Sequence, residues 1–376
     1  MLHIGFDAKR LLFNRSGLGN YSRAVVRALA LHATDAKLTL LSPKSKADWD
    51  KSIAIAGIDP ATVCYNIELV TPSTAPFWWR SRGMGNTAAK SGVDVFHGLS
   101  NEIPFDLPNG IRKVCTIHDM IFLDQPQNYP WLDRNIYRMK VEYALRHCDA
   151  VIATSVFTKN RILFHYPDTS VPIHVVYQPI HPLFKSTEAN PSSDEQPYFI
   201  YHSGFNKRKN HLRLLEAFKS VQQSISQNLL LVGVKGDTYD EVSSWVIRNQ
   251  MTDRVTLKTD VETKELVELL GQSDGFIYPS MMEGFGIPLA EAAALGLNVA
   301  VSDIPVFNEL SSGGFITFNP TQTESIAHAL IRLATLDESG KNQQQAARTK
   351  LVELTNSETI AKQLMAIYKG EHPDAT

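Results

Sequence analysis

The sequence predicts two doubly wound α/β domains arranged in series. Short apolar runs alternate with segments whose apolar residues recur at helical spacing, a pattern typical of βα units and a parallel sheet. The alternation stops in a polar, aperiodic stretch at residues 185–197, KSTEANPSSDEQP, and then starts again. A length of 376 residues also fits two domains better than one core.

The first half is expected to begin with a strand followed directly by a long helix. The strand lies at residues 2–8 (LHIGFDA), the helix at 20–33, and the later strands at residues 37–43, 93–99, 113–119 and 149–155. The predicted domain limits are 1–184 for the first domain, 185–197 for a linker, 198–355 for the second domain and 356–376 for a C-terminal helix. That last helix could pack on either domain, and the first is one candidate.

The second half repeats the pattern. Strands are expected at residues 198–204, 228–233, 254–259, 275–280 and 298–303, and helices at 211–225, 238–250, 263–273 and 288–296. Ligands bind at the carboxyl ends of the strands in such sheets. Two facing domains would place a cleft between them.

Composition is that of a globular protein, with 43% apolar and 20% charged residues. No apolar run reaches the roughly 18–20 residues of a membrane span, and MLHIGFDAKR lacks the pattern of a secretion signal. The three scattered cysteines, Cys64, Cys115 and Cys148, favour a reducing compartment over a disulfide framework. The sequence therefore predicts a cytoplasmic protein, and no Cys/His cluster has the spacing of a zinc site.

Charge is divided unevenly between the two halves. Residues 1–190 hold 21 Lys/Arg and 16 Asp/Glu, while the remainder holds 16 and 23, so +5 and −7 combine to the net −2. A basic first domain could face an anionic acceptor or an anionic membrane surface. Ordinary variation in surface charge would explain the difference equally well.

Three cations stand just before a predicted helix start at Asn210. Lys207, Arg208 and Lys209 follow a strand and a glycine-containing loop. Cations at a helix N-terminus are unfavourable by a few tenths of a kcal/mol each, and a bound anion would compensate. These residues therefore predict a phosphate seat, with a solvated basic loop as the alternative.

Glycines lie between the first strand and the first helix. Gly17 and Gly19 would let the backbone approach a ligand closely. The dinucleotide fingerprint needs a third glycine, and Ser22 occupies that position, which disfavours a dehydrogenase. A plain turn is the alternative.

Polar residues also stand at predicted strand ends in the first half. His118 and Asp119 follow one strand, and His97, Ser100, Asn101 and Glu102 end or follow another. Strand ends are where ligand-binding residues of a doubly wound sheet belong. A single histidine is nevertheless more often structural than catalytic.

Two carboxylates, Glu283 and Glu291, stand with seven residues between them in YPSMMEGFGIPLAEAAALG. Glu291 lies in an apolar helical run, so its carboxyl must be paired or must bind something polar. Glu283 precedes the helix start, where the amides of Phe285, Gly286 and Ile287 are expected to be free. The pair predicts a site for a ligand that carries both hydroxyl groups and negative charge.

The segment APFWWRSRG, residues 75–83, is the best candidate for lipid contact. Tryptophans beside arginines suit a membrane interface. The favoured interpretation is a helix that buries Phe77 and Trp78 on the first sheet with its arginines outside.

In combination these segments resemble the retaining GT-B glycosyltransferases of family 4, the group 1 transferases, over nearly the whole chain. The most specific block is GFIYPSMMEGFGIPLAEAAALGLNVAVSDIPVFNEL, which resembles the family's E-x7-E segment. SGLGNYSRAVVRALA, TIHDMIFLDQP, ATSVFTKNRI and RKNHLRLLEAF also resemble family segments in the family's order. The resemblance implies two Rossmann-like domains that face each other across a cleft. It also implies transfer with retention of anomeric configuration by front-face displacement, without a catalytic metal.

Residue roles follow from the resemblance. Glu283 would contact the hydroxyls of the donor sugar and stabilise charge at its anomeric centre, and Glu291 would bind the ribose. Lys209 and Arg208 would hold the diphosphate. The remaining implied contacts are donor binding by Gly17, Gly19, Phe285, Gly286 and Ile287, a sugar contact by His118, and acceptor binding by Asn101 and Glu102.

The resemblance departs from the family at Gly204, where many members carry an arginine five residues before the phosphate-site lysine; Arg208 is expected to replace its charge. The expected partners are a nucleotide-sugar donor, with GDP-mannose as the first choice, and a glycan acceptor on a lipid carrier. Neither a nucleic acid nor a cofactor beyond the NDP-sugar co-substrate is expected, and peripheral association with the cytoplasmic face of the inner membrane is considered. A non-catalytic sugar-nucleotide-binding protein and a sugar-nucleotide epimerase or phosphorylase of the same fold remain the alternatives.

Overall fold

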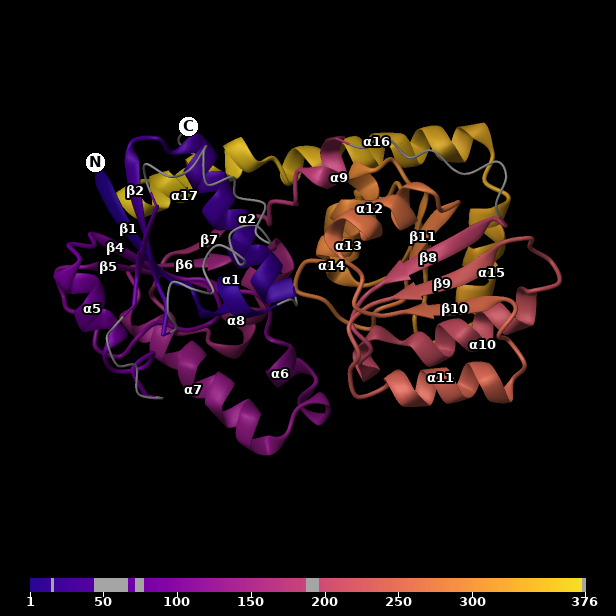
Figure 1. Cartoon of the computed structure of the whole chain (residues 1–376), viewed down its shortest axis with the longest axis horizontal. Helices are drawn as coiled ribbons and strands as arrows, with labels where there is room; N and C mark the ends of the chain where they lie inside the picture. The colour runs from indigo at the N-terminus through magenta and orange to yellow at the C-terminus, as the bar shows by residue number, and fades with distance from the viewer. Residues whose placement is uncertain (15–16, 44–66, 72–77, 187–195, 374–376) are drawn as a thin grey trace. The chain divides into compact units, whose positions relative to one another are not determined.

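The computed structural model describes residues 1–14, 17–43, 67–71, 78–186 and 196–373. They form two compact units, Met1–Pro179 with Thr355–Thr376 and Ile180–Leu354 (Figure 1). Each unit contains one parallel sheet, and Figure 1 shows helices flanking both. The predicted fold class, two doubly wound α/β domains, is confirmed.

The sheet of the first unit has seven strands in the order β3-β2-β1-β4-β5-β6-β7, and all of its pairs are parallel. The strands are β1 (Leu2–Asp7), β2 (Ala36–Leu41), β3 (Ile67–Val70), β4 (Val95–Gly98), β5 (Arg112–Ile117), β6 (Ala150–Ala153) and β7 (Ile173–Val175). Strand order runs outward from β1 and reverses between β1 and β4. This reversal is the topological switch point, where ligands of doubly wound sheets bind.

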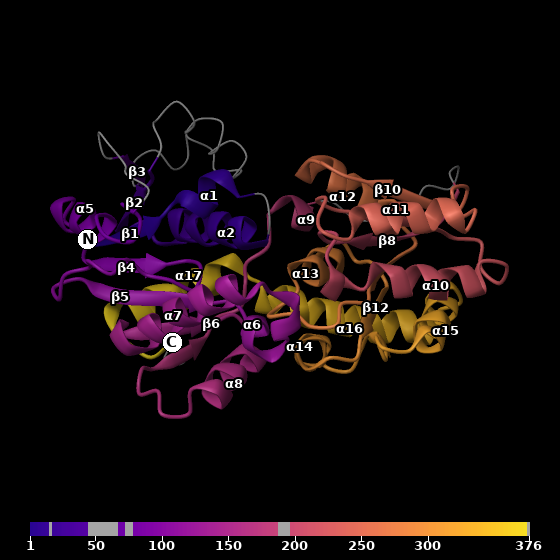
Figure 2. The ribbon, with the colours of Figure 1, turned by 90° about the horizontal axis from the view of Figure 1, so that it is seen from below.

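Helices of the first unit cover both faces of this sheet. They are α1 (Lys9–Phe13), α2 (Gly17–His32), α5 (Met84–Lys90), α6 (Ile121–Asp124), the 3-10 helix η2 (Pro126–Asn128), α7 (Trp131–His147), α8 (Val156–His165) and α17 (Ser357–Lys369). Short α1 lies beside α2 (Figure 2). The C-terminal helix α17 packs on α2, and its residues Ile360 and Leu364 belong to the same buried cluster as Val25. Asn356 caps α17 by accepting hydrogen bonds from the N–H groups of Glu358 and Thr359.

The sheet of the second unit has six strands in the order β10-β9-β8-β11-β12-β13, again all parallel. They are β8 (Tyr198–His202), β9 (Asn228–Val232), β10 (Val255–Lys258), β11 (Gly275–Tyr278), β12 (Val299–Ser302) and β13 (Ile316–Phe318). Every residue of β11 and β12 is buried, as expected for central strands covered by helices on both faces. The switch point of this sheet lies between β8 and β11.

Nine helical segments complete the second unit within the part of the chain that the structure describes. They are α9 (Leu183–Ser186), the 3-10 helix η3 (Lys207–Lys209), α10 (His211–Val221), α11 (Tyr239–Arg248), α12 (Thr263–Gly271), α13 (Ile287–Ala294), α14 (Pro305–Ser311), α15 (Thr323–Ala334) and α16 (Glu338–Leu354). In α10 the buried residues Leu214, Phe218 and Val221 recur at three- and four-residue spacing, which gives the helix one core-facing stripe.

The boundary between the first unit and the second differs from the expected one. The first unit ends at Pro179, so residues 180–184 and α9 group with the second unit. Most of the expected linker, residues 187–195, lies outside the described residues. The cysteines Cys115 and Cys148 are free thiols, and Cys64 lies outside the described residues.

Candidate functional site

The switch point of the second unit collects the basic and acidic residues singled out in the sequence. β8 ends at His202 and leads through a loop into η3, which consists of Lys207, Arg208 and Lys209. The neighbouring strand β11 ends at Tyr278 and leads through Glu283 to α13. Because both strands are parallel and adjacent, their carboxyl ends bring these two segments together.

Glu283 is the centre of this cluster. Its Oε1 accepts hydrogen bonds from Lys209 Nζ and, at 3.2 Å, from the Tyr278 hydroxyl, and its Oε2 accepts one from Arg208 Nη1 at 2.9 Å. Burial alone would raise the pKa of this carboxyl, but Arg208 and Lys209 outweigh it and lower the pKa to about 2. The side chain is therefore ionised at neutral pH, and the structure brings Glu283, Lys209 and Arg208 together as the sequence predicts.

Hydrogen bonds to the backbone carbonyls of Lys209 and Arg208 hold η3 in place. The Tyr201 hydroxyl donates to the carbonyl of Lys209 at 2.9 Å, and the N–H of Met281 donates to the carbonyl of Arg208 at 2.8 Å. The sequence argument required an anion to compensate the basic run, and Glu283 supplies one negative charge for two of the three cations. The third, Lys207, is exposed.

The N-terminus of α13 opens beside Glu283. Gly286 is its N-cap residue with φ +112°, a conformation that side chains rarely adopt, and a Cβ there would lie 2.8 Å from Phe307. Phe285 is buried, and Pro288 occupies the first turn, where it needs no hydrogen-bond donor. The amides of Gly286 and Ile287 have no acceptor among the described residues, so they can receive an anion.

Glu291 lies inside α13 and has no hydrogen-bond partner for its buried Oε2 among the described residues. Burial raises the pKa of this carboxyl to about 8. His202, the last residue of β8, has a buried Nδ1 that lies 3.8 Å from Oε2 and is also without a hydrogen-bond partner. Because neither Glu291 Oε2 nor His202 Nδ1 has a hydrogen-bond partner, each atom can bond a hydroxyl group of a ligand.

His202 was not among the residues predicted for the site. Burial and the nearby Lys209 lower the pKa of its imidazole to about 4, so the ring is neutral near pH 7. Its position at the carboxyl end of a central strand is the signal that would have identified it.

Gly204, where many members of the family that the sequence resembles carry an arginine, lies in the loop after β8. A Cβ there would have no neighbour nearer than 3.8 Å, so the position has room for a side chain. Arg208 reaches Glu283 from η3, so its charge lies in this cluster, and its replacement of the missing arginine stays a prediction.

The switch point of the first unit holds an ion-pair cluster. Arg80 pairs with Asp7 at the end of β1 and with Glu102 in the loop after β4, and Lys140 Nζ of α7 lies 2.5 Å from Glu102. Burial opposes ionisation of Glu102, but Arg80 and Lys140 lower the pKa of its carboxyl. Glu102, expected to bind acceptor, is thus neutralised within the protein by two cations.

The interpretation of residues 75–83 as a helix that buries Trp78 with its arginines outside is wrong for its described part, except that Arg82 is exposed as expected. Trp79 is buried whereas Trp78 is 51% exposed, and Arg80 is drawn into the ion-pair cluster. Residues 78–83 form turns that precede α5. Phe77 lies outside the described residues.

His118 lies after β5 and is held by backbone and side-chain contacts. The backbone N–H of His118 donates to Asn101 Oδ1 at 2.9 Å, and the ring Nε2 donates to the carbonyl of Leu99 at 2.8 Å. Burial lowers the pKa of the ring to about 4, so His118 is neutral near pH 7. Asn101 adopts φ +59° and its side-chain oxygen is engaged by His118, which gives it a positioning role beside the expected acceptor role.

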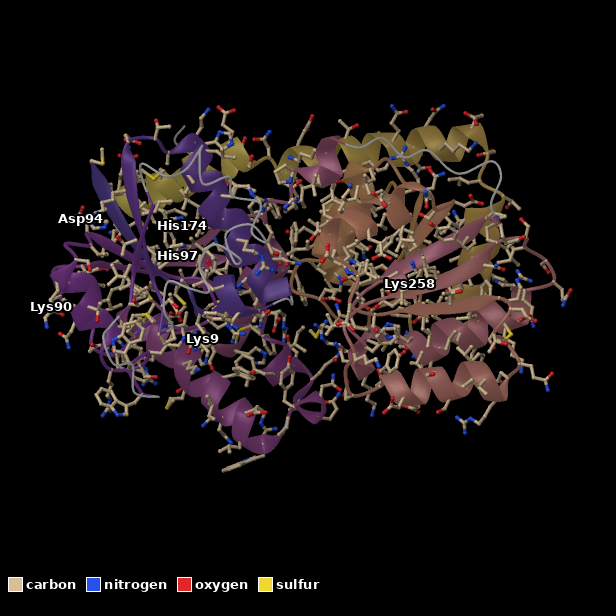
Figure 3. The ribbon with its side chains drawn as sticks, in the orientation of Figure 1. Lys9, Lys90, Asp94, His97, His174 and Lys258 are labelled. Atoms are coloured by element: carbon tan, nitrogen blue, oxygen red, sulfur yellow. The ribbon has the colours of Figure 1, made fainter. Side chains whose placement is uncertain are left out.

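A buried hydrogen-bonded chain lies beneath His118. His97 of β4, labelled in Figure 3, bonds the Tyr368 hydroxyl of α17 at 2.7 Å through Nδ1 and Thr116 of β5 at 2.8 Å through Nε2. Thr116 in turn bonds the Tyr21 hydroxyl at 2.9 Å, and the Tyr21 ring packs edge-on against His118. Burial lowers the pKa of His97 to about 3. His97 is therefore a structural histidine that ties α17 to the sheet.

The glycines near the first strand do not occupy the expected loop. Gly17 and Gly19 both lie in the first turn of α2. A Cβ on Gly19 would lie 1.8 Å from the carbonyl oxygen of Asn14, whereas one on Gly17 would meet nothing within 4 Å. Gly19 thus permits the close approach of α2 to the chain after α1, and a contact of either glycine with a donor stays a prediction.

The described residues contain no group of three His, Cys, Asp or Glu side chains arranged to hold a metal ion. None of the described helices combines the length and apolar character needed to cross a bilayer.

Removing the buried carboxyl of Glu291 is expected to change how the free energy of unfolding depends on pH. The pKa of Glu291 rises from 4.5 on folding to about 8, so the folded state retains a proton that the unfolded state loses in this range. The free energy of unfolding should therefore fall by up to about 1.4 kcal/mol per pH unit between those values. Glu291→Gln should lack this decline in urea unfolding measured from pH 5 to 8.5.

The exposed Glu268 of α12 provides the matched control. Glu268→Gln should keep the pH dependence of the wild type. Parallel curves for the wild type and Glu291→Gln would mean that Glu291 is ionised in the folded protein and has a partner in solution.

Comparison with known proteins identifies the family. A family model described as "Glycosyl transferases group 1" matches residues 184–350, and one described as "Glycosyltransferase Family 4" matches residues 15–182. Two curated relatives are the O-antigen chain mannosyltransferase RfbU of Salmonella typhimurium, 28% identical over 61% of this chain, and the O-antigen chain mannosyltransferase B of Escherichia coli, 27% identical over 63%. The chain spans 62% and 64% of their lengths.

A solved structure shares the fold over the whole chain. Anabaena Alr3699/HepE in complex with UDP and glucose superposes with a TM-score of 0.73 and 14% identity, and the match covers 98% of this chain and 100% of that one. The two family models together match nearly every residue from 15 to 350. The chain therefore belongs to the family 4, group 1 glycosyltransferases.

Proposed function

We propose that the protein transfers a sugar from a nucleoside diphosphate sugar to a growing glycan. The cluster at the second switch point carries this proposal, because Lys209 and Arg208 converge there on Glu283 beside the open N-terminus of α13. A diphosphate fits the cations and the helix amides. The unsatisfied Glu291 fits the ribose hydroxyls.

The same residues account for catalysis of the transfer. The bond between the anomeric carbon and the diphosphate oxygen breaks, and negative charge grows on the leaving group. Lys209 and Arg208 stabilise that charge, while the ionised Glu283 stabilises positive charge at the anomeric carbon and contacts the sugar hydroxyls. This role requires the diphosphate to compete with Glu283 for the two cations.

The proposed stereochemical course is retention by front-face displacement. The acceptor hydroxyl forms its bond to the anomeric carbon on the face that the diphosphate leaves, and its proton passes to a diphosphate oxygen. Glu283 is bonded by both cations and by Tyr278, which favours an electrostatic role over nucleophilic attack. Because two side-chain cations already face the leaving group, we propose that no catalytic metal is needed.

The first choice of donor is GDP-mannose, and the first choice of acceptor is a surface polysaccharide on a lipid carrier. Support comes from the names of the relatives, both O-antigen chain mannosyltransferases. UDP-sugars are the competing donors, since the structure of the Anabaena protein contains UDP. We place the reaction in the cytoplasm, with the protein peripheral at the inner face of the membrane.

A thermal-shift panel of GDP, UDP, GDP-mannose and UDP-sugars, each with and without Mg²⁺, tests this function. Ligand that binds only the folded state raises the melting temperature, and at 100 times its Kd it adds about 2.7 kcal/mol of stability. We expect the guanosine series to stabilise the wild type without Mg²⁺, and Lys209→Ala to lose the shift.

Other outcomes of the panel separate the alternatives. Stabilisation by uridine nucleotides would identify a UDP-sugar as the donor instead of GDP-mannose. A thermal shift that requires Mg²⁺ would contradict the proposal that no catalytic metal is needed. Binding of a nucleotide-sugar without turnover on any lipid-linked glycan would favour a non-catalytic sugar-nucleotide-binding protein. No shift at millimolar nucleotide would overturn the donor site itself.

A further inference from the structure

His202 and Glu291 face each other across a gap at the second switch point. The buried atoms His202 Nδ1 and Glu291 Oε2 lie 3.8 Å apart, and neither has a hydrogen-bond partner among the described residues. A hydrogen bond between them would need a distance of about 3.5 Å or less. Because buried polar groups of folded proteins are normally paired, two facing atoms without partners point to a ligand that supplies the missing bonds.

Both residues stand on elements of the core. His202 ends β8, a central strand, and its backbone is in register with Val232 of β9. Glu291 lies inside α13 between the buried residues Ala290 and Ala292, and α13 packs on β11 and β12. The gap between the two side chains is therefore set by a strand and a helix of the core, which hold a site more precisely than loops do.

The width of the gap fits one hydroxyl group. An oxygen about 2.8 Å from each atom closes a triangle on the 3.8 Å base and meets the two atoms at an angle of about 85°. A hydroxyl donates one hydrogen bond and accepts others, so it can bond both atoms when either one carries a proton. A metal ion would need further ligands, and the described part of the chain contains no group of three His, Cys, Asp or Glu side chains that could hold one.

The pair lies just below the surface of the second unit. The side chains of His202 and Glu291 are 22% and 6% exposed, although the two facing atoms are shielded from solvent. The torsion that turns a histidine ring about its Cβ–Cγ bond is broad, so the ring can rotate at little cost. A small rotation of the His202 ring therefore admits a hydroxyl to the gap.

The neighbours of the pair indicate which hydroxyl enters. Lys209, which bonds Glu283, is close enough to His202 to lower the pKa of its ring. Contacts thus run in the order Glu283, Lys209, His202 and Glu291. In a nucleoside diphosphate sugar the diphosphate has hydroxyls on both sides, those of the sugar and those of the ribose. With Glu283 at the sugar and Lys209 at the diphosphate, His202 and Glu291 come to the ribose.

We propose that His202 is a specificity-determining residue, which holds one hydroxyl of the donor ribose between its Nδ1 and Glu291 Oε2 and so rejects deoxyribonucleotides. A donor that lacks this hydroxyl leaves both polar atoms buried and unpaired in the complex, which is the strongest way for a site to discriminate against a missing group. The assignment rests on the proposed function, because it requires a nucleotide donor. It adds to the ribose contact of Glu291 a second residue that contact with Glu291 alone does not need.

Titration calorimetry of the full chain near pH 7 tests the proposal with GDP, 2′-deoxy-GDP and 3′-deoxy-GDP, or with the uridine series if the thermal-shift panel selects it. Wild type is expected to bind at least one deoxy form about tenfold more weakly than the ribonucleotide. His202→Val should lower the affinity for the ribonucleotide to that for the deoxy form, so that their ratio falls below about twofold. His202→Asn keeps a polar nitrogen near the position of Nδ1 and should restore most of the ratio.

A double-variant comparison tests whether one hydroxyl bonds both residues. Glu291→Met removes the carboxyl and keeps the length of the side chain. If a single hydroxyl lies between the two atoms, His202→Val/Glu291→Met should bind the ribonucleotide within about twofold of the weaker single variant. Losses that multiply would give each atom a hydroxyl of its own and would overturn the shared bond.

The exposed His328 of α15 provides the matched control, and His328→Val should keep the affinity and the ratio of the wild type. Equal binding of all three nucleotides by wild type, which needs no variant, would mean that water fills the gap and would overturn the role of His202 while the donor site stands. A ratio that survives in folded His202→Val would do the same. Restoration by His202→Gln but not by His202→Asn would assign the contact to Nε2 and overturn the shared bond. Wild type that binds no nucleoside diphosphate would overturn the proposed function, and this inference with it.

Discussion

Replacing Lys209 with alanine is expected to lower the kcat of sugar transfer by about 10²–10³-fold, as the loss of one charge-stabilising donor does in other enzymes. The ammonium of Lys209 is buried and bonded to Glu283. In the proposed mechanism it would act on the leaving diphosphate as a desolvated charge, where its effect would be largest. Initial rates with the donor selected by the thermal-shift panel give the measurement.

Lys207 of the same 3-10 helix is the control, because it is exposed and forms no part of the Glu283 cluster. Lys207→Ala should keep kcat within about twofold. Lys209→Ala also removes one partner of a buried carboxylate, so the circular dichroism spectrum and melting temperature of the variant must be recorded. A folded Lys209→Ala protein with more than a third of the wild-type kcat would show that Lys209 does not stabilise the leaving group.

The central strands of both sheets were predictable because helices cover them on both faces and their sequences are continuous apolar runs. The strands β3, β7 and β13, which the sequence analysis did not predict, all lie at sheet edges. β7 and β13 have three residues each, and the central residue of β13 is exposed. Such short, half-covered segments carry too little apolar pattern to be distinguished from loops.

The position of the cluster around Glu283 was predictable from the sequence, but the pairing of its side chains was not. Glu283 and Lys209 follow adjacent parallel strands, so topology alone brings them to one edge. Whether Glu283 contacts a sugar or bonds Lys209 and Arg208 depends on side-chain distances that spacing does not contain. His202 was not predicted because it lies inside the expected strand at residues 198–204, where sequence pattern alone does not separate a ligand-binding side chain from a core-facing one.

Arg80 was predicted at the surface but lies in an ion-pair cluster. Its apolar neighbours suggested a helix with arginines at the surface, yet Asp7 and Glu102 draw its guanidinium inward. These partners are 73 and 22 residues away in the sequence. A buried ion pair between distant segments leaves no local pattern, because only the folded sheet brings the charges together.

Gly19→Ala is expected to reduce the free energy of unfolding by about 3 kcal/mol, the upper end of the usual cost of overpacking. A methyl group there would lie 1.8 Å from the carbonyl oxygen of Asn14, so backbone rather than a flexible side chain has to move. The displacement would separate α1 from α2, which lie side by side (Figure 2). Urea unfolding followed by circular dichroism measures the loss.

Gly17→Ala is the matched control, since the same change two residues earlier meets open space. Alanine is the better helix former, so this variant should equal the wild type in stability or exceed it by up to about 0.5 kcal/mol. Comparing the two variants separates a role of Gly19 in nucleotide binding from a role in the packing of α2. If Gly19→Ala is as stable as wild type but loses nucleotide binding, the glycine serves the donor and the tight approach to Asn14 relaxes at little cost. If it is unstable while Gly17→Ala is stable and binds nucleotide normally, Gly19 is there for the packing of α2.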